Sequence, residues 1–306
     1  MTYVVKSLGP GGVEAMRQLW NRLRRGLLRA RSFSGKYRCA VCGNRVSRFR
    51  CLAATHPETA QNLKKHGFRH VDETFNMDQY SCPFCGACDR DRMYALYLNK
   101  YLTGPSARIR IVDFAPLKSL SQFIRHKLES MGGAHVYRTA DLYDPQADDK
   151  VDLMDMKLYK DGEFDFFICS HVLEHVEADR KALSELFRIT KPGGCGILMA
   201  PIALTIDQTD EDPRLTDEAE RWRRFGQNDH VRLYSKQGFL DRLVEAGFEV
   251  QQLGVDYFGK PSFEENAIGL GSVLYVVRRP ASDVRDTDWV TVVPAHHERM
   301  PSEIKT

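Results

Sequence analysis

Phe164-Asp-Phe-Phe-Ile-Cys-Ser-His-Val-Leu-Glu-His-Val176 is the stretch of sequence that decides the fold. Its first six residues form a mostly apolar run that is typical of a buried strand. A helix is expected next over Asp179–Ile189, then a turn at Lys191-Pro-Gly-Gly194 and a second strand over Cys195–Met199. Strand, helix and strand in this order predict a βαβ unit, in which the two strands run parallel.

The same alternation continues on both sides of this unit. One helix is expected to end near Ser130 and another to cover Lys236–Ala246. Further strands are expected over Ile109–Asp113, His135–Thr139, Phe248–Val255 and Ser272–Arg278. This pattern predicts an α/β domain with a doubly wound, Rossmann-like sheet over residues 105–280, followed by a polar tail over residues 281–306.

Polar residues follow the expected strands, at the edge where doubly wound sheets bind ligands. Asp141 ends the second strand, where a carboxylate can accept hydrogen bonds from both hydroxyls of a ribose. Asp152 lies in the next crossover, where an acid can accept from an adenine amino group between apolar neighbours. The full set of expected cofactor contacts is Asp113, Phe114, Ala115, Pro116, Asp141, Leu142, Asp152, Leu153, Ser170 and His171.

The segment from Phe164 to Gly194 resembles the class I S-adenosylmethionine-dependent methyltransferases around their fourth and fifth strands. The similarity covers roughly residues 108–280 and includes spacing as well as composition. A closer resemblance is to a bacterial subgroup with an N-terminal pair of CxxC motifs and with segments like Asp89-Arg-Asp-Arg92, Phe114-Ala-Pro116 and Phe225–Arg232. The resemblance implies a seven-stranded sheet, S-adenosylmethionine as the cofactor and transfer of its methyl group. Members of the subgroup often occur beside enzymes of glycan and natural-product biosynthesis.

The loop after the first strand departs from the family pattern. The usual glycine-rich GxGxG is absent, and Asp113-Phe-Ala-Pro116 stands in its place. Ala115 is small enough for a cofactor to approach closely, and the fixed φ of Pro116 shapes the turn. The subgroup commonly has an acidic residue after this proline, where this chain has Leu117.

Four of the eight cysteines form two CxxC-Gly motifs. Two intervening residues let both thiolates of a motif reach one ion, so the two motifs predict a closed, structural zinc site. The expected ligands are Cys39, Cys42, Cys82 and Cys85. Cys51 or Cys88 in place of one ligand, and free or redox-active thiols, are the alternatives. We therefore expect a small zinc-ribbon-like module over residues 39–104, with helices near Glu58–His66 and Asp89–Lys100.

Basic residues are concentrated near the N-terminus. Residues 1–38 carry nine Lys and Arg and one Glu, which is +8, while the whole chain carries +3, so the remainder carries 3 − 8 = −5. Apolar residues of segment 13–27 recur at helical spacing. This predicts a basic amphipathic arm that docks on its own protein, on a second copy of the chain or on anionic lipid. The acidic remainder disfavours nucleic acid as a partner.

The longest apolar runs, such as Phe164–Cys169 and Gly271–Val277, are far shorter than the ~20 residues of a membrane span. The first ten residues lack the pattern of a secretory signal. The expected location is therefore the cytoplasm, with the basic arm as a peripheral contact at the inner face of the membrane.

His230 is the leading candidate for a general base. It lies in the long polar segment between the fifth strand and the last helix, where the acceptor is expected to bind, and imidazole accepts a proton near neutral pH. Asp229 is expected to orient this ring, and Gln227 and Arg232 are expected to bind the acceptor, Arg232 through an acidic group. The alternatives are His171 as the base and a structural role for His230.

His171-Val-Leu-Glu174-His175 also matches the H-x-x-E-H signature of one class of zinc proteases. Two histidines four residues apart can share a metal. The motif nevertheless follows a buried strand and precedes Lys191-Pro-Gly-Gly194, which is the methyltransferase context. We therefore reject the protease and expect Glu174 and His175 to fix the turn below the cofactor.

The acceptor is expected to be a small molecule or a glycan. Methyltransferases that act on amino groups of bases usually carry an Asp/Asn-Pro-Pro-aromatic turn, and Cys169-Ser-His-Val172 takes that place here. O-methylation of a sugar, a glycolipid or a related metabolite is therefore the main hypothesis. Methylation of ribosomal RNA by an enzyme with a zinc module and an inactive scaffold with the same fold are the alternatives.

Overall fold

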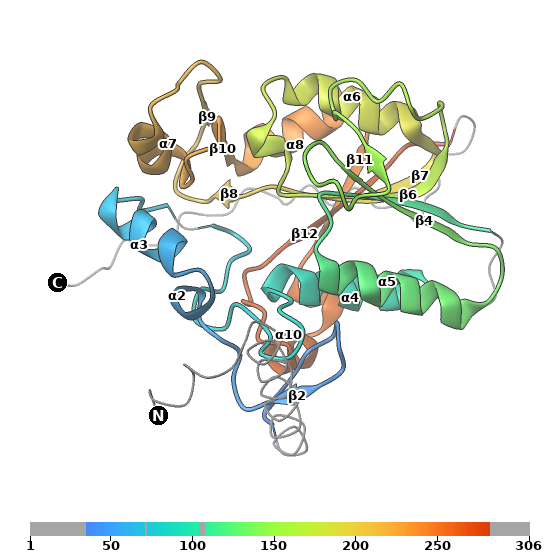
Figure 1. Cartoon of the computed structure of the whole chain (residues 1–306), viewed down its shortest axis with the longest axis horizontal. Helices are drawn as coiled ribbons and strands as arrows, with labels where there is room; N and C mark the ends of the chain where they lie inside the picture. The colour runs from blue at the N-terminus through green and yellow to red at the C-terminus, as the bar shows by residue number, and fades with distance from the viewer. Residues whose placement is uncertain (1–34, 71, 104–107, 282–306) are drawn as a thin grey trace, which may run out of the picture.

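The fold is built around one large sheet (Figure 1). The structure is a computed structural model, which describes residues 35–70, 72–103 and 108–281. Its strands lie in the order β11 (Glu249–Leu253), β12 (Leu274–Arg278), β7 (Thr190–Met199), β6 (Phe164–Ser170), β3 (Arg110–Phe114), β4 (Val136–Asp141) and β5 (Asp149–Lys150). β12 runs antiparallel to both of its neighbours, and the other pairs are parallel. The expected doubly wound, seven-stranded α/β sheet is confirmed.

Helices cover both faces of this sheet (Figure 1). One face carries α4 (Asp89–Tyr101) and α5 (Lys118–Met131), and the other carries α6 (Asp179–Ile189) and α8 (Lys236–Glu245). Residues four apart on α5, namely Leu120, Ile124 and Leu128, are buried, as helical periodicity requires. The apolar run of β6 is buried as well, because a central strand of such a sheet is covered on both sides.

Lys191-Pro-Gly-Gly194 does not form the expected turn between a helix and a strand. It lies inside β7 as a bulge, because Phe164 of β6 pairs with Thr190 whereas Phe166 already pairs with Cys195. Gly193 supplies a left-handed φ of 78°, and a Cβ on Gly194 would lie 3.0 Å from the Asp165 carbonyl oxygen. Pairing with β6 therefore extends the strand backwards through residues that locally favour a turn.

The cysteine segment (residues 35–88) packs against the same body. It contains the hairpin of β1 (Tyr37–Arg38) and β2 (Arg45–Val46), followed by α2 (Leu52–Thr55) and α3 (Pro57–Lys65). Its small apolar core, which includes Phe49, is completed by Ala95 of α4 and by Ala267. Ala267 follows the short helices α9 (Val255–Phe258) and α10 (Lys260–Glu265), so the cysteine segment and the chain after α10 meet at α4.

Arg92 of α4 fastens this contact. The side chain is fully buried, and its guanidinium lies 3.8 Å from the ring centroid of Phe49. It donates to the backbone carbonyl oxygens of Gln79, Tyr80, Ala87 and Asn266. One residue of the Asp-Arg-Asp-Arg stretch is thus structural, because it satisfies carbonyls from two distant parts of the chain.

A second, smaller sheet follows β7. In it β10 (Arg232–Ser235) pairs in parallel with β8 (Ile202–Ala203) and antiparallel with β9 (Asp210–Glu211). Helix α7 (Glu218–Phe225) leads into β10; Asp217 caps its first turn and Gly226 ends it with a φ of 83°. Val231 N donates to Glu174 O, which brings the chain before β10 against the 3-10 turn Leu173–His175 after β6.

Two expectations lie outside the described residues: the amphipathic helix of the basic arm and the polar tail from residue 282 onward. Their contacts with lipid or with a second copy of the chain stay predictions. Among the helices that are described, none is long and apolar enough to cross a membrane.

Candidate active site

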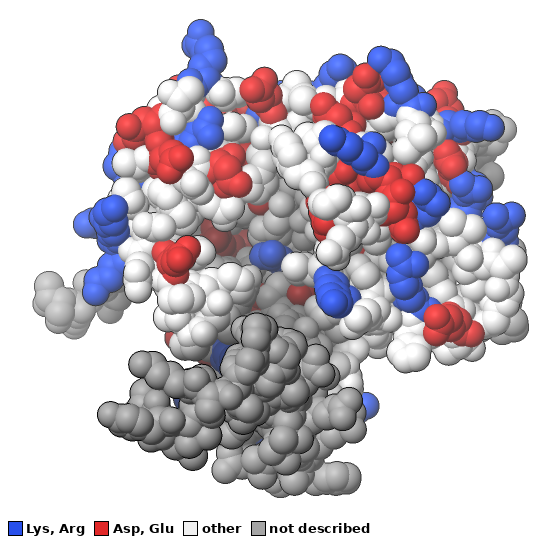
Figure 2. All heavy atoms as spheres, viewed as in Figure 1, with Lys and Arg blue, Asp and Glu red and all other residues white. Residues whose placement is uncertain are grey.

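Two cavities lie at the carboxyl end of the large sheet. The smaller has a volume of about 120 Å³ and the larger about 380 Å³. Arg90 and His171 line both cavities, so these two side chains form a shared wall. Figure 2 shows this face of the molecule hollowed at its centre, with acidic and basic side chains visible inside. This is the edge at which the sequence places ligand binding.

The smaller cavity collects half of the expected cofactor contacts. Asp113, Phe114 and Ala115 reach it from the end of β3, and Ser170 and His171 reach it from the end of β6. The Tyr94 hydroxyl of α4 lies 2.8 Å from Ser170 Oγ, which fixes the far wall.

Two of these residues have a backbone conformation that favours glycine. Ala115 has a φ of 49° and His171 a φ of 57°. Their amide groups are anchored to neighbouring strands, Ala115 N on Ala140 O and His171 N on Met199 O. Such strain in residues other than glycine collects at functional sites, where the surroundings enforce it. The loop without GxGxG thus keeps a left-handed position, with Ala115 in the place of a glycine.

Asp113 is buried at the base of the smaller cavity. The Tyr137 hydroxyl donates to its Oδ2 at 2.6 Å. Burial raises the pKa of this carboxyl to about 7, although the hydrogen bond from Tyr137 acts in the opposite direction. Asp113 was expected at the end of its strand, but β3 continues through Phe114, so its backbone is paired on both sides.

The other expected cofactor contacts lie further along the same edge and line neither cavity. They are Pro116, Asp141, Leu142, Asp152 and Leu153. Asp141 ends β4 as expected, and its Oδ1 accepts from the amides of Tyr143 and Asp144 at 2.7 and 2.8 Å. Asp152 Oδ1 accepts from Met154 N at 2.8 Å. In both cases the turn holds one carboxylate oxygen, which sets the direction of the other.

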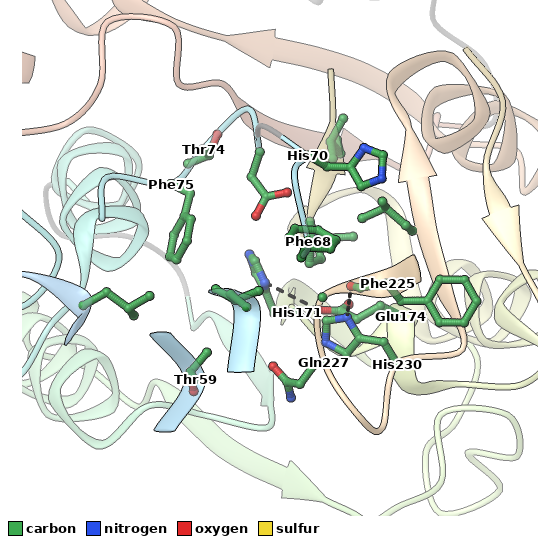
Figure 3. A pocket seen from close by; sticks show the side chains of 18 of the residues that line it. Thr59, Phe68, His70, Thr74, Phe75, His171, Glu174, Phe225, Gln227 and His230 are labelled. Carbon is green, nitrogen blue, oxygen red and sulfur yellow. Dashed lines mark hydrogen bonds and ion pairs between the residues drawn. The ribbon is translucent and has the colours of Figure 1, made fainter. Parts of the chain in front are cut away.

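The larger cavity contains the imidazole cluster, defined here as His171, Glu174, His175 and His230. Figure 3 shows His171, Glu174 and His230 turned toward one another, with Gln227 nearby. The first three come from the turn after β6, and His230 comes from the segment before β10. The cavity therefore joins two parts of the chain that are more than fifty residues apart in sequence.

Each ring of this cluster is held by a partner at Nδ1. His230 Nδ1 lies 3.1 Å from Phe225 O, and His171 Nδ1 lies 3.5 Å from Glu174 Oε1. His175 Nδ1 lies 3.2 Å from Asp229 Oδ2, and the rings of His175 and His230 meet edge to face at 4.6 Å. Burial lowers the pKa of His230, and burial together with Arg90 lowers the pKa of His171 to about 4.

The structure corrects the role expected of Asp229. This carboxylate orients His175 and not His230, whose ring is held by the Phe225 carbonyl instead. Gln227 Nε2 donates to Asp229 Oδ1 at 2.9 Å and also lines the larger cavity, as expected for a residue near the acceptor.

The expectation that Arg232 binds an acidic acceptor is wrong. Its side chain is fully buried, and its guanidinium faces the carbonyl oxygens of Leu173, Val176 and Glu177 and the carboxylate of Glu211. Every nitrogen of the group is thus engaged within the protein. Arg232 pins the turn after β6 to β10, and so it holds the imidazole cluster in place without touching the cavity.

Charged residues of the cavities were missed from the sequence, among them Asp72 and Arg90. Asp72 and Arg90 line the larger cavity, and Asp72 Oδ1 and Arg90 Nε are buried without a hydrogen-bond partner. Burial raises the pKa of Asp72 to about 7, and the nearby Glu174 acts in the same direction. Arg90 belongs to the Asp-Arg-Asp-Arg stretch and could have been found there, whereas no sequence pattern marks Asp72.

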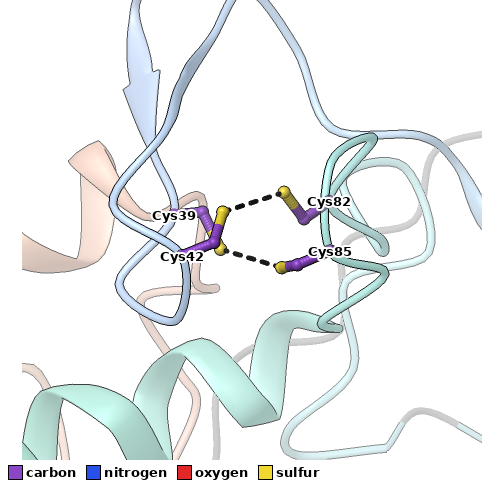
Figure 4. A group of neighbouring side chains, drawn as sticks. All are labelled: Cys39, Cys42, Cys82 and Cys85. Carbon is purple, nitrogen blue, oxygen red and sulfur yellow. Dashed lines mark hydrogen bonds between the residues drawn. The ribbon is translucent and has the colours of Figure 1, made fainter. Parts of the chain in front are cut away.

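The four cysteines of the CxxC motifs converge (Figure 4). Cys39 Sγ lies 3.7 Å from Cys85 Sγ, and Cys42 Sγ lies 3.8 Å from Cys82 Sγ. Sulfurs bound at about 2.3 Å to one tetrahedral zinc lie about 3.8 Å apart, so the donor set fits this ion. Cys51 and Cys88 lie outside the cluster, at the caps of α2 and α4, so neither replaces one of the four expected ligands.

The two motifs share one local design. Gly43 N donates to Cys39 O, and Gly86 N donates to Cys82 O. Both glycines have a left-handed φ, of 71° and 82°. Each motif is therefore a tight turn that presents two thiols on the same side.

Comparison with known proteins gives one family. The model of a family described as a methyltransferase domain matches residues 96–253, more than half of the chain. The match contains β3, β4, β6 and β7 and both cavity-lining turns after β3 and β6. No protein of established description matches the chain in sequence.

The solved structures to which the chain is similar include several methyltransferases. A putative methyltransferase of Bacillus halodurans is 17% identical; the match covers 61% of this chain and 99% of that one, with a TM-score of 0.36. An S-adenosylmethionine-dependent methyltransferase of Mesorhizobium loti is 18% identical, with 62% and 98% covered and a TM-score of 0.39. The 1,6-didemethyltoxoflavin-N1-methyltransferase of Burkholderia thailandensis, solved with S-adenosylhomocysteine, is 13% identical, with 62% and 78% covered and a TM-score of 0.40.

Proposed function

The chain belongs to the methyltransferase-domain family as an S-adenosylmethionine-dependent methyltransferase, and on this premise we propose that it methylates a hydroxyl group of a small polar acceptor such as a sugar or glycolipid. The observation that carries the proposal is the wall that Arg90 and His171 form between the two cavities. A methyl donor in the smaller cavity and an acceptor in the larger one would meet at this wall. Holding both partners in line is the main task of such an enzyme.

We propose that the cofactor lies along the carboxyl edge of β3, β4 and β6. Asp141 would accept from the ribose hydroxyls with Oδ2, since Oδ1 is occupied by two amides. Asp152 would accept from the adenine amino group, with Leu142 and Leu153 packing on the ring. Asp113, Phe114, Ala115, Pro116 and Ser170 would surround the amino-acid end. When bound, the cofactor supplies an electrophilic methyl group on a sulfonium.

The acceptor would bind in the larger cavity, whose volume of about 380 Å³ suits a small molecule. Its oxygen forms a bond to the methyl carbon while the carbon–sulfur bond breaks, and the hydroxyl proton passes to an imidazole of the cluster. His230 offers Nε2 for this proton, because its Nδ1 faces the Phe225 carbonyl and therefore carries hydrogen. His171, which lines both cavities, is the alternative base. Gln227 offers an amide for a hydroxyl of the acceptor.

We also propose that Cys39, Cys42, Cys82 and Cys85 hold one structural zinc ion. The sulfur spacing supports it, and so does the small apolar core around Phe49, which is limited to a few side chains. A metal with four protein ligands has no open position, so its role would be to hold the cysteine segment together. This segment supplies Asp72 and much of the wall of the larger cavity.

A transfer assay tests the function. Zinc-loaded full-length protein would be incubated with methyl-labelled S-adenosylmethionine and a panel of sugars, nucleotide sugars and glycolipids. Label is expected in an ether linkage on a hydroxyl, and His230→Ala should reduce turnover by roughly 10²–10⁴-fold. His126→Ala, on the exposed face of α5, is the matched control and should leave turnover unchanged. Label that enters ribosomal RNA and no hydroxylated small molecule would contradict the proposal.

A further inference from the structure

Glu174, His175 and His230 form a second group of potential metal ligands, far from the cysteines. One donor atom from each lies within 4.8 Å of the others. Ligands held at about 2.1 Å by a single ion lie roughly 3–4 Å apart, so small side-chain rotations would complete such a site. All three residues line the larger cavity, and any ion held there would face the space assigned to the acceptor.

An unpartnered buried atom points to the same place. Glu174 is 1% exposed, and its Oε2 has no hydrogen-bond partner. A buried carboxylate oxygen without a partner is costly, and native proteins satisfy nearly all such atoms. Glu174 Oε1 therefore faces His171, and Oε2 is available to bind a ligand.

The two histidines have the outer contacts that metal ligands require. His175 Nδ1 meets the carboxylate of Asp229, and His230 Nδ1 meets the carbonyl of Phe225. Histidines that bind metals almost always donate their second ring nitrogen to a carboxylate or a backbone carbonyl, which fixes the ring and its tautomer. In both rings this arrangement leaves Nε2 as the atom with a free lone pair.

We propose that Glu174, His175 and His230 bind a divalent transition-metal ion that coordinates the acceptor. Two imidazoles and one carboxylate suit manganese, iron or cobalt better than calcium or magnesium. Three protein ligands leave positions open to the cavity, unlike the closed cysteine site. This inference rests on the proposed function and narrows it, because an acceptor with two adjacent oxygens, such as the vicinal diol of a sugar, would chelate the ion.

The ion also changes the chemistry assigned to His230. A hydroxyl bound to a divalent metal loses its proton to water more readily, as metal-bound water does. An ion held by Glu174, His175 and His230 would therefore help the acceptor hydroxyl lose its proton to water as its oxygen bonds to the methyl carbon and the carbon–sulfur bond breaks. His230 would act here as a ligand rather than as the base.

The test is a titration of zinc-loaded, full-length protein with Mn²⁺. Electron paramagnetic resonance measures the concentration of free Mn²⁺ at each step. One saturable Mn²⁺ per chain is expected beyond the zinc. Glu174→Gln and His175→Gln should each weaken binding by roughly 100-fold or more, since loss of outer partners alone costs 10–100-fold. Glu129→Gln is the matched control: it removes the same charge from an exposed histidine–glutamate pair on α5 and should leave Mn²⁺ affinity unchanged.

Each variant would also be checked for zinc content, thermal melting and S-adenosylhomocysteine affinity, which should match wild type. His175 is about one-third exposed, so His175→Gln keeps the test valid if replacement of the buried Glu174 disturbs folding. Absence of saturable Mn²⁺ binding, or equal binding by wild type and His175→Gln, would overturn the site. Comparison of Mn²⁺ binding with methyl transfer separates this inference from the proposed function. Methyl transfer to a hydroxyl in the absence of Mn²⁺ binding would overturn the metal site alone. Mn²⁺ binding without methyl transfer to a hydroxyl would overturn the proposed acceptor.

Discussion

The backbone at Ala115 and His171 shows how individual residues shape the junction of the two cavities. Both adopt a left-handed conformation that costs side-chain-bearing residues free energy, and both do so directly after a buried strand. Hydrogen bonds from Ala115 N and His171 N to neighbouring strands hold both turns in this conformation. Two of the three such residues in the described part of the chain therefore lie where donor and acceptor would meet, and the third, Ala267, packs in the core of the cysteine segment.

Asp113 makes the stability of the fold depend on pH. Burial raises its pKa to about 7, above the ~3.9 of an unfolded chain, so the folded protein holds a proton that the unfolded chain releases. The free energy of unfolding should therefore fall as pH rises from about 4 to 7. Asp113→Asn removes this titration, and its stability relative to wild type should grow by roughly 2–4 kcal/mol between pH 4 and pH 8.

Urea unfolding of cofactor-free protein at several pH values measures this difference. Asp91 and Tyr137 face the same carboxyl, and both are unchanged in the variant. A stability difference that stays constant across the pH range would show that Asp113 titrates normally.

Asp141 should contribute to cofactor affinity through one oxygen. Asp141→Asn keeps an oxygen for the amides of Tyr143 and Asp144 but removes an acceptor for the ribose hydroxyls. Affinity for S-adenosylhomocysteine, measured by titration calorimetry, should fall by roughly 1–3 kcal/mol. Asp144→Asn, an exposed neighbour whose carboxylate holds only Gln146 N, is the control and should bind as wild type. Unaltered affinity in Asp141→Asn would remove Asp141 from the cofactor site.

Single residues were the hardest feature to predict from the sequence. Asp141 follows its strand and Cys39, Cys42, Cys82 and Cys85 converge because spacing along the chain determines such positions. The partner of Asp229 and the burial of Arg232 depend on how the segment before β10 packs on the turn after β6. No local sequence pattern indicates that contact. Asp229 was therefore wrongly expected to orient His230, and Arg232 was wrongly expected to bind the acceptor.

At the scale of elements, the two CxxC turns test the proposed zinc site. Cys82→Ser should lose the metal and destabilise the cysteine segment, because three thiolates hold zinc poorly and the segment has little apolar core of its own. Cys51→Ser should keep one zinc per chain, since Cys51 lies at the cap of α2. Metal analysis by mass spectrometry checks both variants, and zinc retained in Cys82→Ser would refute the assigned ligand set.

Arg232 should act on the stability of β10 rather than on the acceptor. Arg232→Gln removes the partner of buried carbonyls in the turn after β6 and one of the two arginines that pair with Glu211. Loss of one member of a buried ionic network costs about 3–5 kcal/mol. Arg223→Gln, an exposed residue of α7 paired with Glu220, is the control and should cost less than about 1 kcal/mol.

Thermal and chemical unfolding measure these costs. If Arg232→Gln has wild-type stability but a raised KM for an acidic acceptor, Arg232 binds the acceptor and the structural role assigned here is wrong.

The elements themselves were largely predictable. α6, α8, β6 and β11 appear within about two residues of the expected bounds, because their apolar patterns are strong, whereas β10 was not expected as a strand. The exception is Lys191–Gly194, where pairing with β6 draws a proline-glycine turn into β7. The hydrogen bonds of a central parallel strand stabilise this segment more than its local preference for a turn does. The sequence alone does not show which strand supplies those hydrogen bonds.

At the scale of the whole molecule, the larger cavity, which we propose binds the acceptor, is assembled from distant parts of the chain. Asp72 comes from the cysteine segment, His171 from the turn after β6 and Gln227 from the chain before β10. Arg92 and the apolar core around Phe49 fasten the cysteine segment to α4. The cysteine segment is therefore part of the wall of the larger cavity, and loss of the proposed zinc should alter acceptor binding as well as stability.

A crystal structure of the zinc-loaded chain with S-adenosylhomocysteine tests the central claim, that donor and acceptor meet at the wall formed by Arg90 and His171. The account predicts the cofactor along the ends of β3, β4 and β6, with its sulfur beside His171 and directed into the larger cavity. A cofactor whose sulfur is separated from the imidazole cluster by protein, or that occupies the larger cavity itself, would contradict it.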